Sequence, residues 1–117
     1  MIRVRRVYDP PEAADGLRIL VDRLWPRGLA KQAAHLDVWA RDLAPSPALR
    51  RWFGHDPARW SEFQRRYRLE LQENAAALAA LRARIGGGTA TLLTATRDAG
   101  HSHAHVLEAV LRDSPQP

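Results

Sequence analysis

The chain has 117 residues and a formal net charge of +5 at pH 7, and it contains no cysteine. This length predicts one domain, residues 1–117, that buries about two-thirds of the surface of its unfolded chain. The absence of cysteine excludes disulfides, zinc–thiolate sites and thiol catalysis. All of the 18 basic residues except Lys31 are arginines, which permits contact with phosphate, nucleic acid or acidic lipid and equally fits a genome rich in Arg codons.

The first part of the chain predicts three strands. Residues 2–8 alternate in polarity as an edge strand does, and residues 17–24 are apolar on both faces, which is typical of a buried parallel strand. Residues 28–36 predict a short helix. Residues 37–43 are ambiguous, and we interpret them as a third short strand that ends before Pro45.

Two proline signals then predict helices. Ser46 is an N-cap with proline at the first helical position, and its helix ends near Gly54. Asp56-Pro57 repeats the signal and opens a long helix, whose apolar residues recur at steps of three, four or seven. Asn74 lies on that apolar stripe, so we expect the helix to bend or break there.

The last part of the chain predicts a strand between two helices. The three glycines 86–88 end the long helix, residues 89–96 form the fourth strand, and residues 102–112 form the last helix. Residues 114–117 are a frayed tail. Helices between strands indicate a small single-domain α/β layered fold, with a mainly parallel sheet of about four strands flanked by helices.

In such sheets, ligands bind beyond the carboxyl ends of the strands. Three segments follow the predicted strand ends, residues 22–28, 41–46 and 94–103, and they hold most of the chemically capable side chains. We therefore expect one cleft at this edge. The residues expected around it are Asp22, Arg23 or Arg27, Ser46 and His103.

The run from Val21 to Gly28 is the most distinctive motif. Arg23 and Arg27 offer planar donors that suit phosphate or carboxylate, and Trp25 offers a face on which a ligand can stack. The structural alternative is an ion pair between Asp22 and one of these arginines that holds a turn, with Trp25 packed in the core.

Histidines occupy alternate positions at 101, 103 and 105. They would share one face in a strand, but the following residues are helical, so a three-histidine chelate is not favoured and no metal site is predicted. His103 falls in the first helical turn and points inward, as a general acid or base, as an anion ligand or as a core histidine. With Asp22 and Asp98, it would position the ligand or transfer protons.

The segment of residues 50–68 is rich in arginine. Such a stripe binds phosphates in nucleic-acid-binding modules, but it is also typical of a solvated helix face with pairs such as Glu62–Arg66 and Arg66–Glu70. Tyr67 and Glu70 lie three residues apart and could edge a ligand pocket with their polar ends. Ser46 would donate to an anion from a helix N-terminus.

No stretch approaches the ~20 apolar residues of a membrane span. The first residues run directly into a strand pattern and contain no apolar signal core. We therefore expect a cytoplasmic protein that does not contact a membrane.

The chain is similar to the YeaO-like branch of domain-of-unknown-function family 488. The likeness covers nearly the whole chain, and it departs at Ser102, where Asn is usual. It implies a small α/β domain and supplies no substrate, cofactor or catalytic residue. The segments that carry the likeness are Arg6-Val7-Tyr8, Val21 to Gly28, Asp42 to Ser46, Leu49 to Asp56, Phe63 to Leu71 and His101 to Ala104.

Three functions remain open from the sequence. The leading hypothesis is a small-molecule site for an anionic ligand at the strand ends, with catalysis undecided. The second is a nucleic-acid-binding module that uses residues 50–68. The third is a structural or protein-interaction domain, which includes a homo-oligomer.

Overall fold

Four parallel strands form one sheet in the computed structural model, which describes residues 1–97 and 101–113. The sheet order is β1-β4-β2-β3, with β1 Ile2–Arg6, β2 Leu17–Leu20, β3 Val38–Trp39 and β4 Ala90–Thr94. The parallel α/β fold is thereby confirmed, with β1 at one edge. Because the strands are parallel, all of them end at the same side of the sheet, here called the carboxyl edge.

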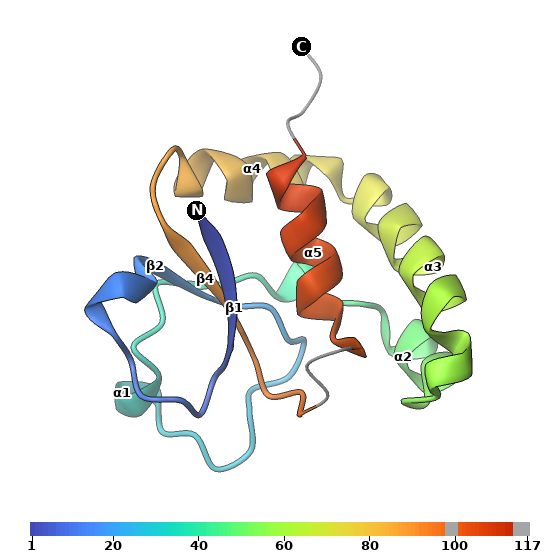
Figure 1. The fold of residues 1–117 in the computed structure, drawn as a ribbon, viewed down its shortest axis with the longest axis horizontal. Coiled ribbons are helices and arrows are strands. Elements are labelled where there is room, and N and C mark those ends of the chain that lie inside the picture. The colour runs from blue at the N-terminus through green and yellow to red at the C-terminus, as the bar shows by residue number, and fades with distance from the viewer. Residues whose placement is uncertain (98–100, 114–117) are drawn as a thin grey trace.

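The helices are unequally shared between the two faces of the sheet (Figure 1). One face carries the larger core, which side chains such as Ile19 and Leu92 enter beneath the longer helices. The other face carries a smaller core around Leu20 and Leu93, covered by the loop that contains α1. The helices are α1 Lys31–Ala34, α2 Pro47–Phe53, α3 Trp60–Glu73, α4 Ala75–Ile85 and α5 His103–Arg112.

Capping residues set both ends of α2 where the sequence predicts them, whereas the helix predicted at 28–36 is reduced to Lys31–Ala34 and α3 begins at Trp60, after a 3₁₀ turn that follows Asp56. The Ser46 hydroxyl accepts a hydrogen bond from the Leu49 amide at 3.1 Å, and Gly54 ends α2 with φ of 53°. The predicted break at Asn74 is confirmed, because α3 ends at Glu73 and α4 begins at Ala75. Single-turn 3₁₀ helices span Ala13–Asp15, Arg41–Leu43 and Pro57–Arg59.

The strands are shorter than predicted, and side chains account for the difference at β2. The Val21 amide makes the last ladder bond, to the Leu93 carbonyl at 3.0 Å. At the next position the Asp22 carboxylate, instead of a strand carbonyl, accepts from the Ala95 amide at 2.8 Å. The predicted strand at 37–43 is reduced to two residues, because the chain turns into a 3₁₀ helix that carries Leu43 into the core.

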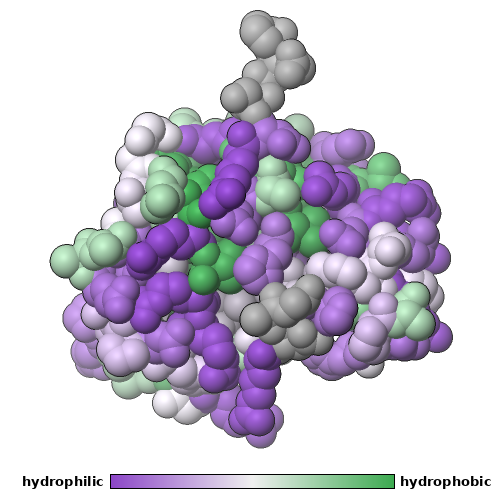
Figure 2. Space-filling view, viewed as in Figure 1, coloured by the Kyte–Doolittle hydropathy of each residue, from purple (hydrophilic) through white to green (hydrophobic). Residues whose placement is uncertain are grey.

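Hydrophilic side chains cover most of one face of the molecule, with small hydrophobic patches among them (Figure 2). Among the described residues, the large hydrophobic side chains that are exposed are Met1, Tyr8, Leu24 and Leu69. No described helix is both long enough and apolar enough to cross a bilayer.

A buried carboxylate pairs with arginines at the amino edge of the sheet, the side where the strands begin. Asp15 is completely buried and forms ion pairs with Arg3, Arg5 and Arg18. Burial raises the pKa of Asp15, but hydrogen bonds from the Glu12 amide, Arg5 and Arg18 outweigh it and lower the pKa to about 2. Arg3, Arg5 and Arg18, which belong to β1 and β2, therefore each have a carboxylate partner at this edge.

We predict that Gly16→Ala destabilises the protein far more than Gly28→Ala. Both glycines have positive φ, 64° and 76°. A Cβ at Gly16 would lie 2.2 Å from the Thr89 carbonyl oxygen, whereas a Cβ at Gly28 meets nothing within 4 Å. Backbone strain alone costs about 1 kcal/mol, and the clash raises the cost at Gly16 to about 3 kcal/mol. Urea unfolding of the two variants measures the difference, and equal losses would contradict this account.

Candidate functional site

Asp22 joins three segments of the carboxyl edge. Its side chain is buried directly after β2, with the residue 7% exposed. Oδ1 accepts from the Thr94 hydroxyl at 2.7 Å, and Oδ2 accepts from the Ala95 amide at 2.8 Å. The Nε2 atom of His103 lies 3.2 Å from Oδ1. The carboxylate therefore links β2 to the end of β4 and to the first turn of α5.

His103 is held by the same group. Its Nε2 atom lies 3.0 Å from the Val21 carbonyl oxygen and 3.2 Å from the Asp22 carboxylate. Since both neighbours are acceptors, we assign a proton to Nε2. The ring also packs edge-on against Tyr67, with centroids 6.1 Å apart.

The Asp22 carboxylate remains ionised. Burial raises its pKa, but the hydrogen bond and the charge of His103, together with the bonds from Ala95 and Thr94, outweigh burial and hold the pKa below its ordinary value. Both oxygens already accept hydrogen bonds from the protein. Asp22 is therefore suited to positioning its neighbours and is poorly suited to donating a proton.

Two neighbouring lobes of one cleft open beyond the strand ends. The arginine lobe has a volume of about 420 Å³, and the histidine lobe has a volume of about 410 Å³. The arginine lobe is lined by Asp22, Arg23, Leu24, Trp25, Pro26, Arg27, Pro47, Arg50, Arg51 and Ala95. The histidine lobe is lined by Asp22, Arg50, His55, Ala95, Thr96 and Arg97.

The arginines of the arginine lobe are not neutralised by the described carboxylates. Arg23 is half-buried and donates to the carbonyl oxygens of Ala44 and Pro45 at 3.2 and 3.4 Å. The side chains of Arg27, Arg50 and Arg51 are exposed and form no ion pair within residues 1–97 and 101–113.

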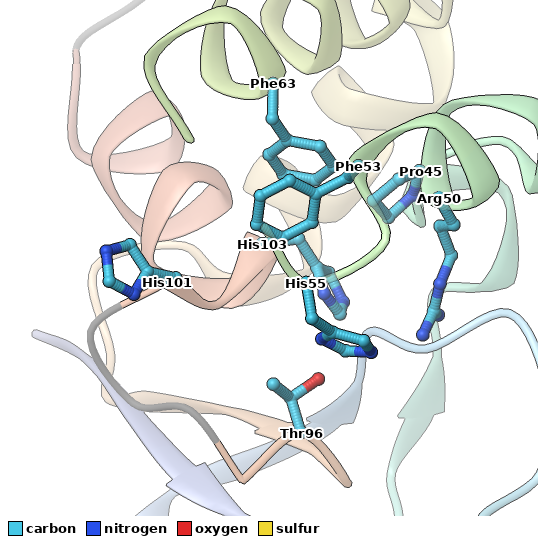
Figure 3. A pocket seen from close by; sticks show the side chains of 8 residues that line it. All are labelled: Pro45, Arg50, Phe53, His55, Phe63, Thr96, His101 and His103. Carbon is cyan, nitrogen blue, oxygen red and sulfur yellow. The ribbon is translucent and has the colours of Figure 1, made fainter. Parts of the chain in front are cut away.

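A smaller recess lies behind the lobes (Figure 3). Its volume is about 30 Å³, which is room for one or two water molecules. Figure 3 shows the His55 imidazole facing Thr96 at the opening, with the Arg50 side chain reaching the same level from α2. His103 lines this recess and not the arginine lobe.

Hydrogen bonds fix the loop that carries the arginines. The Trp25 indole donates to the Leu29 carbonyl at 2.7 Å, and its ring packs edge-on against Trp39, with centroids 5.5 Å apart. The Trp39 indole in turn donates to the Asp22 carbonyl at 2.7 Å. Tyr8 donates to the Arg27 carbonyl at 2.7 Å. The lobe is therefore largely formed before a ligand arrives.

Some of the expected site residues lie elsewhere. The Ser46 amide and hydroxyl both donate to the Glu70 carboxylate, at 2.8 and 2.6 Å, and Ser46 lines neither lobe. Tyr67 is fully buried, its hydroxyl donates to the Leu43 carbonyl at 2.6 Å, and burial raises its pKa. Asp98 and the predicted tail at 114–117 lie outside the described residues.

Sequence reasoning missed several residues of the cleft. The sequence contains a signal for three of them. Arg50 and Arg51 follow Pro47 by three and four residues, so the three residues share one face of α2. The other missed residues are His55, Thr96 and Arg97. Among the described residues, no group of histidine, aspartate and glutamate has an arrangement that could hold a metal ion.

The arginines of α3 are largely engaged within the protein. Glu62 pairs with Arg65 at 2.7 Å and with Arg66 at 2.8 Å, the second of which the helical spacing predicts. Arg66 also stacks on Trp52 at 4.0 Å. The predicted pair of Arg66 with Glu70 does not form, because Glu70 binds Ser46.

We predict that Asp22→Asn lowers the free energy of unfolding by about 2–4 kcal/mol at pH 7, because buried donors lose an ionised acceptor. Since folding lowers the pKa of Asp22, its stabilisation is present above the unfolded pKa of about 3.9 and is lost as pH falls through the folded pKa. Urea unfolding between pH 7 and pH 3 should show the difference from wild type shrinking. The exposed Asp42→Asn is the matched control, and a loss that is constant with pH would refute this role for Asp22.

Comparison with known proteins places the chain in a family. The family model described as the inactive DUF488-N3 subclade matches residues 1–116. The uncharacterized protein YeaO of Escherichia coli strain K12 is 39% identical, over 95% of this chain and 96% of its own length. The uncharacterized proteins Rv3073c of Mycobacterium tuberculosis strain H37Rv and Mb3100c of Mycobacterium bovis are each 46% identical, over 94% of this chain and 92% of their own. No solved structure matches. The chain belongs to the inactive DUF488-N3 subclade, and its resemblance to the YeaO-like branch is confirmed.

Proposed function

We propose that the protein binds a small anionic molecule, with a phosphate or carboxylate group held in the arginine lobe. The observation that carries this proposal is that four arginines border the lobe without an ion pair to any described carboxylate. They are Arg23, Arg27, Arg50 and Arg51. A guanidinium group presents a fork of N–H donors that matches the oxygen atoms of these anions.

The one carboxylate among the described lining residues does not oppose an incoming anion strongly. Asp22 is buried, and its oxygens already accept hydrogen bonds from Thr94, Ala95 and His103. The lobe therefore presents a net positive charge inside a concave surface, where field lines concentrate and attract anions.

Apolar side chains offer a place for the organic part of the ligand. Leu24 is 78% exposed beside the lobe, and Pro26, Pro47 and the half-buried Trp25 also line it. A site with apolar walls and a few charged groups is typical of small-molecule pockets. We infer that the ligand carries an apolar or aromatic group next to its anionic group.

We favour binding without catalysis. The subclade to which the chain belongs is described as inactive. In addition, Asp22 has its hydrogen-bonding capacity taken up, and His103 lines the inner recess and not the arginine lobe. In this proposal both residues position the strand ends and transfer no proton.

Nucleic-acid binding through residues 50–68 is the less favoured proposal. Two arginines of that segment, Arg65 and Arg66, already pair with Glu62. Of the arginines in this segment without an ion pair to a described carboxylate, Arg50 and Arg51 border the arginine lobe, where a phosphate ligand accounts for them equally well, and only Arg68 is left exposed on α3.

Titration calorimetry with phenyl phosphate, which joins an anion to an aromatic ring, tests the proposal. Removing one charged contact costs about 1.5–3 kcal/mol, so Arg27→Ala and Arg51→Ala should each weaken binding about tenfold or more. Arg68→Ala removes the same charge from an exposed site on α3 and is the matched control. Equal affinities in all three variants, or no binding by wild type, would refute the proposal. Loss of DNA or RNA binding on replacing Arg65, Arg66 and Arg68, without phenyl phosphate binding, would favour the nucleic-acid proposal.

A further inference from the structure

Arg50 borders the arginine lobe, the histidine lobe and the inner recess. We infer that the site takes an organic diphosphate, with one phosphate in each lobe and the Arg50 guanidinium donating to both. This inference rests on the proposed function, because it places the first phosphate in the arginine lobe, and it adds a second subsite.

The histidine lobe has its own set of groups that suit a phosphate. Arg97 is exposed and forms no ion pair with a described residue, and the Thr96 hydroxyl and the His55 imidazole lie at the opening. The only described carboxylate that lines this lobe is again Asp22, which is already hydrogen-bonded. A second anion therefore meets the same electrostatic conditions as the first.

The backbone holds His55 at this opening. His55 has φ of 56°, a left-handed conformation that is uncommon for residues other than glycine. The turn is fixed on both sides, because Gly54 donates to the Arg50 carbonyl at 3.1 Å and Asp56 donates to the Phe53 carbonyl at 3.0 Å. Strained conformations of this kind persist where the surrounding structure determines them, and they cluster at ligand sites.

The charge balance favours two linked anionic groups over one. The two lobes share Asp22, Arg50 and Ala95, so they are parts of one cleft. A single monoanion in the arginine lobe would leave Arg97 without an ion pair to any described group. Two phosphates joined by a bridging oxygen would reach cations on both sides of Arg50, and linking the groups spares the entropy of binding a second ion.

The apolar lining sets the orientation. Leu24, Trp25 and Pro26 line only the arginine lobe, whereas polar and charged side chains predominate in the histidine lobe. The organic group and its first phosphate therefore lie in the arginine lobe, and the terminal phosphate lies beside Thr96 and Arg97.

Calorimetric titration with adenosine monophosphate and adenosine diphosphate, without divalent metal and at one ionic strength, tests this inference. We expect the diphosphate to bind wild type at least tenfold more tightly. Arg97→Ala should remove that advantage and leave monophosphate binding unchanged, whereas Arg27→Ala should weaken both ligands about tenfold. Arg68→Ala should change neither. Arg97 makes no ion pair with the described residues, so its variant should retain the wild-type unfolding temperature.

The outcomes separate the inference from the proposed function. Equal affinities for the two nucleotides, or an Arg97→Ala variant that binds both as wild type does, would overturn the diphosphate subsite and leave the anion site intact. Equal weakening of both ligands by Arg97→Ala would also overturn it, because one phosphate would then contact both lobes. Phosphate binding that is insensitive to Arg27→Ala would refute the proposed function itself.

Discussion

Ionised and buried, the Asp22 carboxylate is stable only because protein hydrogen bonds replace the water that it loses on folding. These bonds come from the end of β4 and from the first turn of α5, so satisfying one charge fixes the relative positions of three segments. The loop that follows Asp22 consequently leaves the sheet from a fixed point. Its residues Arg23 and Trp25 reach the cleft for that reason, and the remaining geometry of the carboxyl edge depends on this contact.

Arginine side chains have different partners at the two edges of the sheet. At the amino edge, Asp15 forms ion pairs with three arginines of β1 and β2. At the carboxyl edge, the buried carboxylate is bonded to uncharged donors and to His103, and the arginines of the arginine lobe form no ion pair with a described carboxylate. In the proposed function, the distribution of charge, more than the net charge of +5, directs an anion to one side of the molecule.

Much of the fold could be predicted, because its signals are local. The cap at Ser46, the break at Asn74 and the stop at Gly86 depend on a few neighbouring residues, and the parallel sheet follows from the alternation of strands and helices. The contacts of Glu70 could not be predicted in the same way. Helical spacing favours Arg66 as its partner, but the packing of α2 against α3 brings the Ser46 amide and hydroxyl to it instead.

The residues of the cleft also differ in whether the sequence alone could predict them. Arg23 and Arg27 were found because they follow a strand, and a parallel sheet brings such residues to one edge. The sequence leaves Arg50 and Arg51 open between a phosphate-binding stripe and a solvated helix face, since periodicity shows which residues face the core but not which exposed face borders a cavity. Neither arginine has a carboxylate partner among the described residues, and like charges held together in the folded state repel one another and reduce stability. In the proposed function a bound anion removes that repulsion, so the arrangement that reduces stability in the free protein also makes the cleft selective for negative charge.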